Sequence, residues 1–317
     1  MKIMVTGGAG FIGSHVVDGL LHEGHEVLVV DNLYTGKRTN VNPAARFYEL
    51  DIRSPDTGAL IRREKPDVIN HHAAQMSVPA SVSDPQFDAD VNIKGVLNLL
   101  EAAVAAGVRK MVFISSGGAV YGEAPEYPTS ESCQPTPLSP YAITKYASEH
   151  YLAYYRHQYG LDYTTLRYAN VYGPRQVAHA EAGVVAIFMN NLVKGIPSTV
   201  NHFPDAPAGM VRDYCYVGDI VRANVLALTT GGCEVFNIGT GVETRTLDLY
   251  HTIFEAFQEM SAVREELAVP ETAMARPGDL TRSCLIVKKA RQSLGWVPEV
   301  DLSSGIRKTL MWRLSTG

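Results

Sequence analysis

A tyrosine and a lysine in one short segment give this chain a pair of side chains that could move a proton. Tyr141 and Lys145 stand in the segment YAITK, and residues at positions i and i+4 lie above one another on one helix face. The ammonium group could then act on the ionisation of the phenol or hold a hydroxyl group beside it. A tyrosine has an ordinary pKa of about 10, so a tyrosine base near neutral pH needs a shift of roughly 3 units, or about 4 kcal/mol. The same spacing also occurs in helices that do no chemistry.

Two serines upstream of this pair could supply a hydroxyl group to the same chemistry. The segment ISSGGAVYGE begins as an apolar strand and continues through Ser115, Ser116, Gly117 and Gly118. This pattern is typical of a strand that runs into an active-site loop. Either serine could reach the phenol.

The segment VTGGAGFIG near the N-terminus predicts a site for a dinucleotide phosphate. Gly8, Gly10 and Gly13 form the pattern GxGxxG, and Gly7, Gly10 and Gly13 form GxxGxxG. Both patterns let the backbone approach a pyrophosphate, which the free N–H groups and the positive dipole end of the following helix then face. Strand, turn and helix occur here in the required order.

The acidic residue after the second strand favours NAD over NADP. Asp31 ends the run EVLVV, where a carboxylate accepts hydrogen bonds from the ribose hydroxyls and repels a 2′-phosphate, although Lys37 and Arg38 follow a few residues on. The remaining residues expected to contact NAD follow the glycine loop and the ends of the strands: Phe11, Ile12, Asn32, Leu33, Thr35, Gly36, Asp51, Ile52, His72, Ala73, Ala74, Gln75, Asn92, Ser115, Tyr141, Lys145, Tyr168 and Ala169.

Short β-branched runs that alternate with helical patterns must position these groups. The strand candidates are KIMVT, EVLVV, RFYEL, DVINH and KMVFIS. This alternation favours an α/β fold, a Rossmann-like doubly wound parallel sheet. We expect an NAD-binding domain over residues 1–167 and a smaller C-terminal α/β lobe for the substrate over 168–317, with parts of 211–240 returning to the sheet. In that lobe we expect helices at 184–194 and 247–260 and a strand at 234–239.

Composition narrows the class of protein. The chain has 317 residues, 46% hydrophobic residues and a formal net charge of −5, so it lacks the basic stripe that binds nucleic acid. Its four cysteines form no CxxC pair, so we expect no metal site, and we interpret His71 and His72 as packing residues. MKIMVTGGAG has no long apolar stretch before its glycines, and no later segment approaches the roughly 18–20 apolar residues of a membrane span, so we expect a cytoplasmic protein. The apolar helices at 90–107 and 141–160 predict a homodimer, although burial inside one monomer explains them equally well.

Taken together, the glycine loop, SSGGAVYG, YAITK and RYANVYGPRQ resemble the extended short-chain dehydrogenases/reductases. Within them the chain is most similar to nucleotide-sugar epimerases of the UDP-galactose (UDP-glucose) 4-epimerase family, and VRDYCYVGDI and RPGDLTRS extend the resemblance over the whole chain. The resemblance implies an NAD-dependent 4-epimerase of a UDP-hexose. Tyr141 would take the proton of the sugar 4-hydroxyl while C4 delivers hydride to NAD, through a transient 4-keto sugar. Lys145 and the positive nicotinamide would lower the pKa of Tyr141.

The same resemblance implies a set of residues for the UDP-sugar. Asn170 would hold a phosphate or sugar oxygen, Arg212 and Arg276 the pyrophosphate, and Asp279 the uridine ribose, and arginine suits phosphate because its fork donates two parallel hydrogen bonds. The full substrate set is Ser77, Ser116, Gly117, Tyr141, Asn170, Arg175, Gly183, Val184, Val185, Arg212, Arg276, Asp279 and Ser283.

The chain departs from the family pattern at the hydroxyl beside the tyrosine. Gly117 stands where many relatives carry a catalytic serine or threonine. A shift of one residue along a strand reverses the side chain, so Ser116 could serve only if Gly117 and Gly118 form a bulge through backbone angles closed to other residues. Ser115 is the second choice.

Other departures bear on the reaction and the sugar. Dehydratase relatives carry an Asp-Glu pair where this chain has Gly118 and Ala119, and decarboxylating relatives also carry an acid in this stretch, so both reactions are disfavoured. Ser283 replaces a bulky tyrosine and leaves room for an N-acetyl group, whereas Arg175 could meet a uronate carboxylate. A UDP-glucuronate 4-epimerase, another extended-family oxidoreductase or decarboxylase, and more remotely a non-catalytic NAD-binding sensor stay open.

Overall fold

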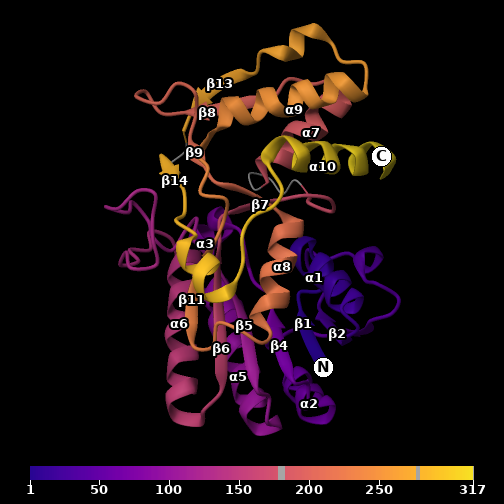
Figure 1. Cartoon of the computed structure of the whole chain (residues 1–317), viewed down its shortest axis with the longest axis vertical. Coiled ribbons are helices and arrows are strands. Elements are labelled where there is room, and N and C mark those ends of the chain that lie inside the picture. The colour runs from indigo at the N-terminus through magenta and orange to yellow at the C-terminus, as the bar shows by residue number, and fades with distance from the viewer. Residues whose placement is uncertain (178–182, 276–278, 317) are drawn as a thin grey trace.

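A parallel sheet of seven strands forms the centre of the protein. The computed structural model describes residues 1–177, 183–275 and 279–316. Within them the strand order is β11-β6-β5-β4-β1-β2-β3 (Figure 1). The strands are β1 (Lys2–Thr6), β2 (Glu26–Asp31), β3 (Arg46–Glu49), β4 (Val68–His71), β5 (Lys110–Ser116), β6 (Asp162–Tyr168) and β11 (Glu234–Ile238). The order reverses at β1, between β2 and β4, and ligands bind at the carboxyl ends of strands beside such a switch point.

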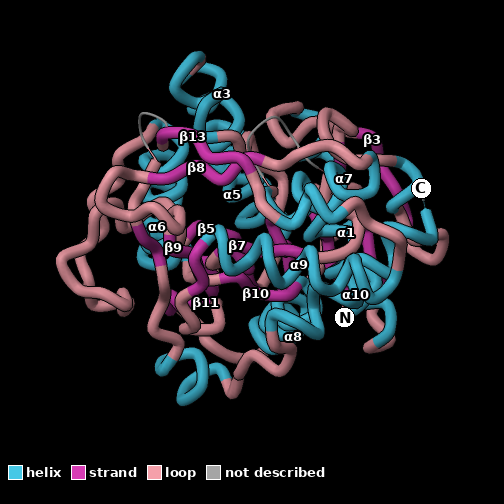
Figure 2. Tube along the Cα trace, turned by 90° about the horizontal axis from the view of Figure 1, so that it is seen from above, coloured by secondary structure: helices cyan, strands magenta, loops and turns pink. Residues whose placement is uncertain are grey.

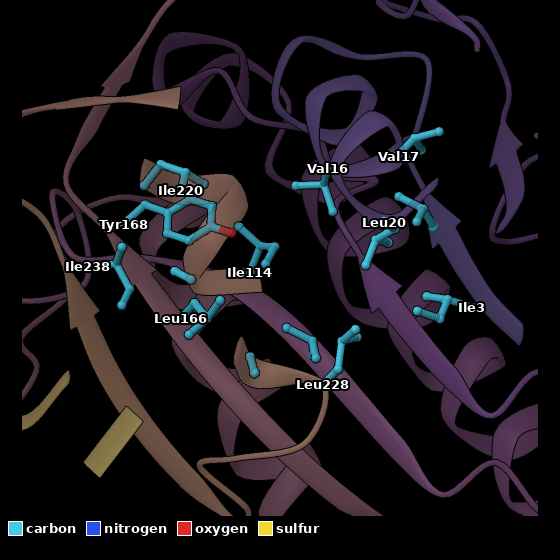
Figure 3. Packing of buried hydrophobic residues seen from close by; sticks show 14 of the residues in the cluster. Ile3, Val16, Val17, Leu20, Ile114, Leu166, Tyr168, Ile220, Leu228 and Ile238 are labelled. Atoms are coloured by element: carbon cyan, nitrogen blue, oxygen red, sulfur yellow. The ribbon is translucent and has the colours of Figure 1, made fainter. Parts of the chain in front are cut away.

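Helices cover both faces of this sheet because its central strands are apolar on both sides. On one face α1 (Phe11–His22) packs against α8 (Val217–Ala227), and on the other α5 (Gly95–Ala106) packs against α2 (Pro55–Glu64) and α6 (Pro140–Tyr159). Figure 3 shows the first of these two cores, in which Ile3, Leu20 and Leu166 are fully buried. The doubly wound α/β fold predicted from the sequence is confirmed.

The catalytic candidates depend on where α6 begins. The Ser139 side chain accepts a hydrogen bond from the Ala142 N–H, Pro140 occupies the first turn, and Gly160 ends the helix with a φ of 74°. Serine at the cap and proline in the first turn are strong start signals, and glycine is a common stop. Tyr141 therefore lies in the first turn of α6, at the carboxyl ends of the strands.

The rest of the chain forms a smaller part above the sheet, with its own apolar core. Figure 2 views this part from above. Its helices are α7 (Val184–Lys194), α9 (Thr246–Met260) and α10 (Leu302–Thr316), and the first two lie within one residue of their predicted ranges. Its short strands are β7 (Asn170–Tyr172), β8 (Thr199–His202), β9 (Val211–Arg212), β10 (Tyr214–Tyr216), β12 (Thr244–Arg245), β13 (Glu271–Met274) and β14 (Arg282–Ser283).

Short helices complete the described structure. They are α3 (Val78–Ser83), α4 (Pro85–Ala89), the 3₁₀ turns η1 (Arg38–Asn40) and η3 (Glu265–Ala268), and the π-helical turns η2 (Asp90–Lys94) and η4 (Ala290–Leu294). Among the described residues, no helix has the length and apolar surface needed to cross a membrane.

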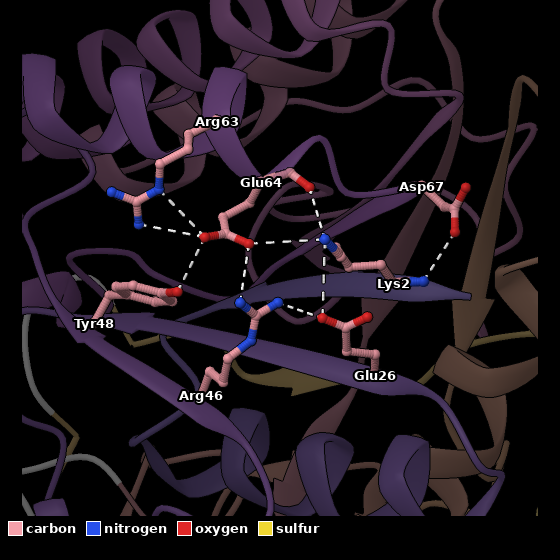
Figure 4. A network of polar contacts seen from close by, with 7 residues as sticks. All are labelled: Lys2, Glu26, Arg46, Tyr48, Arg63, Glu64 and Asp67. Atoms are coloured by element: carbon pink, nitrogen blue, oxygen red, sulfur yellow. Dashed lines mark hydrogen bonds and ion pairs between the residues drawn. The ribbon is translucent and has the colours of Figure 1, made fainter.

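A network of charged residues closes the amino ends of the first strands. Glu64 pairs with Arg46 at 3.1 Å and with Lys2 at 3.7 Å, and Lys2 also lies 3.8 Å from Glu26 (Figure 4). Partly exposed ion pairs of this kind each contribute little to the stability of the fold. The network lies at the opposite end of the strands from the glycine loop.

Candidate active site

A cavity of about 490 Å³ lies at the carboxyl ends of the central strands. This volume is within the range of small-molecule and cofactor sites. Every residue predicted to contact NAD lines it except Leu33, Gly36 and Asn92, and Tyr141, Lys145 and both serines line it too.

The glycine loop is built for close contact between backbone segments. A Cβ atom at Gly13 would lie 2.2 Å from the Gly7 carbonyl oxygen, and one at Gly7 would lie 2.6 Å from the Ala73 nitrogen. Gly10 is the N-cap of α1 and brings no side chain to the first N–H groups of the helix. These N–H groups face the cavity at the positive end of the helix dipole, which fits a pyrophosphate.

Asp31 lines the cavity at the end of β2, where we expect the ribose of NAD. Two of the other residues predicted to contact NAD lie against its carboxylate. Its Oδ2 accepts a hydrogen bond from the Ala9 N–H at 2.9 Å, and its Oδ1 accepts one from the Leu33 N–H at 2.8 Å. A Cβ atom at Gly36 would lie 2.8 Å from Oδ1. Burial raises the pKa of Asp31, and the two N–H groups oppose this. Leu33 therefore holds the carboxylate through its N–H group and Gly36 leaves space for it, and neither residue lines the cavity.

Asn92 supports the cavity wall from behind. Its Oδ1 accepts a hydrogen bond from the Gln75 N–H, and its Nδ2 donates to the Gln75 carbonyl oxygen, both at 2.9 Å. Since Gln75 lines the cavity and Asn92 does not, the role that fits Asn92 is to fix this loop.

The surroundings of Tyr141 favour the protonated phenol. Burial raises its pKa to about 12, a hydrogen bond with Ser116 lowers it, and the charge of Asp88 raises it. Lys145 Nζ donates to the Ile114 carbonyl oxygen at 2.9 Å and lies 6.0 Å from the centre of the Tyr141 ring. Burial lowers the pKa of Lys145 to about 8. The Lys145 ammonium thus donates to a backbone carbonyl group here, and the lowering of the Tyr141 pKa by Lys145 together with the positive nicotinamide stays a prediction.

The chain turns directly after Ser116, where the pairing of β5 with β6 ends. The N–H groups of Gly117 and Gly118 both donate to the Tyr168 carbonyl oxygen, at 2.8 and 3.3 Å, and those of Ala119 and Val120 donate to the Ser116 carbonyl oxygen, at 3.2 and 3.0 Å. The strand therefore ends in a turn and not in the predicted bulge, for which the strand pairing would have to continue beyond it. Neither glycine has a positive φ, so the expectation of special backbone angles is wrong. Space explains Gly117 instead, because a Cβ atom there would lie 2.5 Å from Leu285 Cδ1.

The other serine is engaged elsewhere. Ser115 Oγ donates to Glu149 Oε1 at 2.6 Å, and Arg167 Nε donates to the same oxygen at 3.0 Å. All three side chains are buried. Ser115 thus belongs to a buried ion pair behind Tyr141, and Ser116 is the hydroxyl that meets the phenol.

Some of the residues predicted for the substrate line one of two neighbouring cavities. Ser116, Asn170, Arg175 and Gly183 line the large cavity with Tyr141, whereas Gly117 and Ser283 line a second cavity of about 40 Å³ beside it. A Cβ atom at Gly118 would lie 3.7 Å from Asn170 Oδ1 and 4.0 Å from Ser283 Oγ, so this loop faces both side chains. Arg276 lies outside the described residues.

The other predicted substrate residues do not line these two cavities. Ser77 caps α3 by accepting a hydrogen bond from the Ala80 N–H, and Val184 and Val185 pack into the core around α9. Their apolar side chains leave only backbone groups for a diphosphate.

Arg212 and Asp279 do lie in one region. Arg212 donates to the carbonyl oxygens of Val211 and Leu280, each at 2.8 Å. Burial lowers the pKa of Arg212, and the charge of Asp279 opposes this. Arg175 is held apart from them, since its Nη2 pairs with Asp18 of α1 at 2.8 Å.

Comparison with known proteins identifies the family. Residues 3–239 match the NAD dependent epimerase/dehydratase family. The chain is 48% identical to the UDP-glucose 4-epimerase of Mycolicibacterium smegmatis, and the match covers 98% of this chain and 97% of that protein. The chain belongs to the NAD-dependent epimerase/dehydratase family. The resemblance inferred from the motifs and the prediction of NAD as cofactor are thereby confirmed.

Solved structures of this family share the fold over the full length. The UDP-glucose 4-epimerase of Thermotoga maritima with UDP-glucose has a TM-score of 0.93 and 46% identity, covering 100% of this chain and 99% of that one. The UDP-glucose 4-epimerase of Thermus thermophilus in complex with NAD has a TM-score of 0.92 and 46% identity, covering 100% of both chains.

This epimerase/dehydratase family member also lines its cavity with residues that sequence reasoning missed. Phe87 and Tyr34 have ring centres 6.1 Å apart, and the Arg53 guanidinium lies 5.6 Å from the centre of the Phe87 ring. Met76 and Gln176 line the cavity as well. These residues stand in loops and in the short helix α4, where no periodicity shows which side chains face a ligand.

Proposed function

We propose that this protein is an NAD-dependent 4-epimerase of a UDP-hexose, interconverting UDP-glucose and UDP-galactose. The observation that carries this proposal is the half-buried Tyr141, hydrogen-bonded to Ser116 in the cavity that the glycine loop and Asp31 also line. Full-length similarity to UDP-glucose 4-epimerases supports it.

We assign the chemical roles to four side chains. Tyr141 takes the proton of the sugar 4-hydroxyl and returns it, and Ser116 holds the phenolic oxygen by a hydrogen bond. Lys145 keeps a positive charge beside them, and Asp31 binds the ribose of NAD next to the N–H groups of the glycine loop. Bound NAD supplies the acceptor and donor of hydride at C4, so that a transient 4-keto sugar can be reduced on either face.

The loop around Gly118 supports an epimerase over a dehydratase. Gly118 faces Asn170 and Ser283, and it offers no acid or base. The small side chain of Ser283 leaves space for a larger C2 substituent, so we propose that N-acetylated UDP-hexoses also bind. A uronate is less well supported, because the cation expected to meet its carboxylate, Arg175, pairs with Asp18.

We further propose a division of labour within a cytoplasmic homodimer. Residues 1–167 would hold NAD and residues 168–317 mainly the UDP-sugar, with β11 and α8 packed onto the first part. Ile143, Tyr151 and Tyr154 project from α6 with exposed fractions of 52%, 37% and 50%, which supports α6 as the subunit contact. The cysteines are free thiols, which suits a reducing compartment.

The deciding experiment supplies UDP-galactose to the purified protein without added NAD. We expect UDP-glucose to form with no net NADH. Tyr141→Phe should abolish turnover while NAD stays bound. Tyr159→Phe, at an exposed tyrosine near the other end of the same helix, should turn over normally. Accumulated NADH, carbon dioxide or a 4-keto-6-deoxy sugar would contradict the proposed reaction, and near-normal turnover by Tyr141→Phe would contradict the assigned base.

A further inference from the structure

A buried carboxylate lies behind the two catalytic candidates. Asp88 of α4 is 0% exposed. Its Oδ2 accepts a hydrogen bond from Thr144 Oγ1 at 2.7 Å, and its Oδ1 accepts bonds from Gln75 Nε2 at 2.7 Å and Asn92 Nδ2 at 3.1 Å. None of these three donors carries a charge. The negative charge of Asp88 is therefore satisfied by hydrogen bonds, and among the described residues no cation pairs with it directly.

The three donors come from three different elements around the site. Thr144 stands in α6 between Tyr141 and Lys145, Gln75 follows β4 in the cavity wall, and Asn92 lies in the π-helical turn η2. One carboxylate thus joins the helix that carries the catalytic pair to the loop that lines the cavity. Extra residues in a π-turn often occur where a helix is adjusted to a functional site.

We propose that Asp88 is an electrostatic positioning residue, which fixes α6 against the Gln75 loop and whose charge sets the protonation of Tyr141 and Lys145. The proposal rests on the function proposed above, in which these two residues are catalytic. A buried charge acts strongly on neighbours because little water screens it. A negative charge disfavours a phenolate and favours an ammonium.

The directions of the pKa values agree with this geometry. Asp88 raises the pKa of Tyr141, after the larger effects of burial and of Ser116. Burial lowers the pKa of Lys145, and two carboxylates oppose this. Asp88 has the larger effect of the two and Glu149 the smaller. The other ionisable groups placed around the pair are Glu149 of α6, Arg167 of β6, and His71 and His72 at the end of β4. The pKa values of the two histidines are lowered mainly by burial and next by the charge of Lys145.

Asp88→Asn removes the charge while the hydrogen bonds can be kept. The new Oδ1 can accept from Gln75 and Asn92, and the new Nδ2 can donate to Thr144 Oγ1. The Thr144 hydroxyl can then donate to the Tyr141 carbonyl oxygen, which lies 3.1 Å away. The matched control is Thr144→Val, which keeps the charge and the side-chain shape but loses the hydrogen bond.

The first measurement is the pH dependence of kcat with UDP-galactose. The second is the titration of the Tyr141 phenol, followed by NMR of ring-labelled tyrosine. The signal of Tyr141 is assigned as the one that is lost in Tyr141→Phe. In Asp88→Asn we expect both limbs of the rate profile, and the phenol pKa, to move to lower pH by roughly one unit. In Thr144→Val we expect the limbs to stay in place. If Asp88→Asn does not fold, Asp88→Ser removes the same charge and carries the same expectation.

Unchanged limbs and an unchanged phenol pKa in Asp88→Asn would overturn the proposal and leave Asp88 a purely structural residue. Equal shifts in Asp88→Asn and Thr144→Val would overturn it too, because the hydrogen bond between Thr144 and Asp88, and not the charge of Asp88, would then explain the shifts. The phenol titration needs no turnover. If the wild-type protein fails to interconvert UDP-hexoses, the proposed function fails while the effect of Asp88 on Tyr141 is still measured.

Discussion

Replacing each serine of the loop after β5 separates two roles that look alike in sequence. Ser116 shares a hydrogen bond with Tyr141, whereas Ser115 donates to Glu149 in the buried pair with Arg167. We predict that Ser116→Ala impairs the reaction and that Ser115→Ala impairs stability.

The magnitudes follow from what each hydroxyl contacts. A hydrogen bond to a charged group contributes about 1.5–3 kcal/mol, and the phenolate is the charged partner of Ser116. Its loss should lower kcat near neutral pH by roughly 10- to 150-fold and move the acid limb of the profile upward by one to two units. Ser115→Ala removes one of the donors to Glu149 Oε1, but Arg167 remains at 3.0 Å. We expect it to lower the free energy of unfolding by about 1–3 kcal/mol, with a far smaller loss in kcat.

The assay is kcat at saturating UDP-galactose from pH 6 to 10, together with thermal unfolding of each variant. About 1 kcal/mol corresponds to roughly 2 °C in Tm for a chain of this size. A larger rate loss in Ser115→Ala than in Ser116→Ala would refute the assignment. So would a rate loss in Ser116→Ala without a shift of the acid limb, because the hydrogen bond would then not act through the phenol.

Two further predictions concern the turn after β5 and the carboxylate at the end of β2. Gly117→Ala should destabilise the fold by about 1–3 kcal/mol through overpacking against Leu285, measured by urea unfolding. Gly118→Ala should unfold like the wild type, because Asn170 Oδ1 would lie 3.7 Å from the new Cβ atom, an ordinary contact distance. Asp31→Ser should weaken NAD binding and strengthen NADP binding, measured by calorimetry, because the carboxylate that repels a 2′-phosphate is gone. An unchanged ratio of the two affinities would show that Asp31 does not face the ribose.

The elements and the glycine loop were predictable because their signals are local. A strand buried on both faces needs a run of apolar residues, as in KIMVT and EVLVV, and α7 and α9 carry apolar stripes that end at Gly195 and Ser261. The close approach of Gly13 to Gly7 also follows from neighbouring residues.

The turn after β5 and the burial of Asp88 depend on contacts between distant segments. Whether Gly117 and Gly118 share one acceptor is decided by the register of β6, in which Ser116 lies opposite Tyr168. The polar segment PQFDAD gives no sign that Asp88 is fully buried while Asp90 is partly exposed and paired with Lys94. The sequence pattern alone resembles a solvated helix start.

The opposing effects on Tyr141 and Lys145 explain why a buried carboxylate is compatible with a tyrosine base. Asp88 makes the phenol harder to ionise, while Ser116 makes it easier. The same carboxylate opposes the fall of the Lys145 pKa that burial causes, and so favours the charged ammonium. The charge of Asp88 thus lowers the fraction of Tyr141 that is present as phenolate and helps to keep Lys145 protonated. A positive charge that enters the cavity then favours the phenolate while Lys145 stays an ammonium.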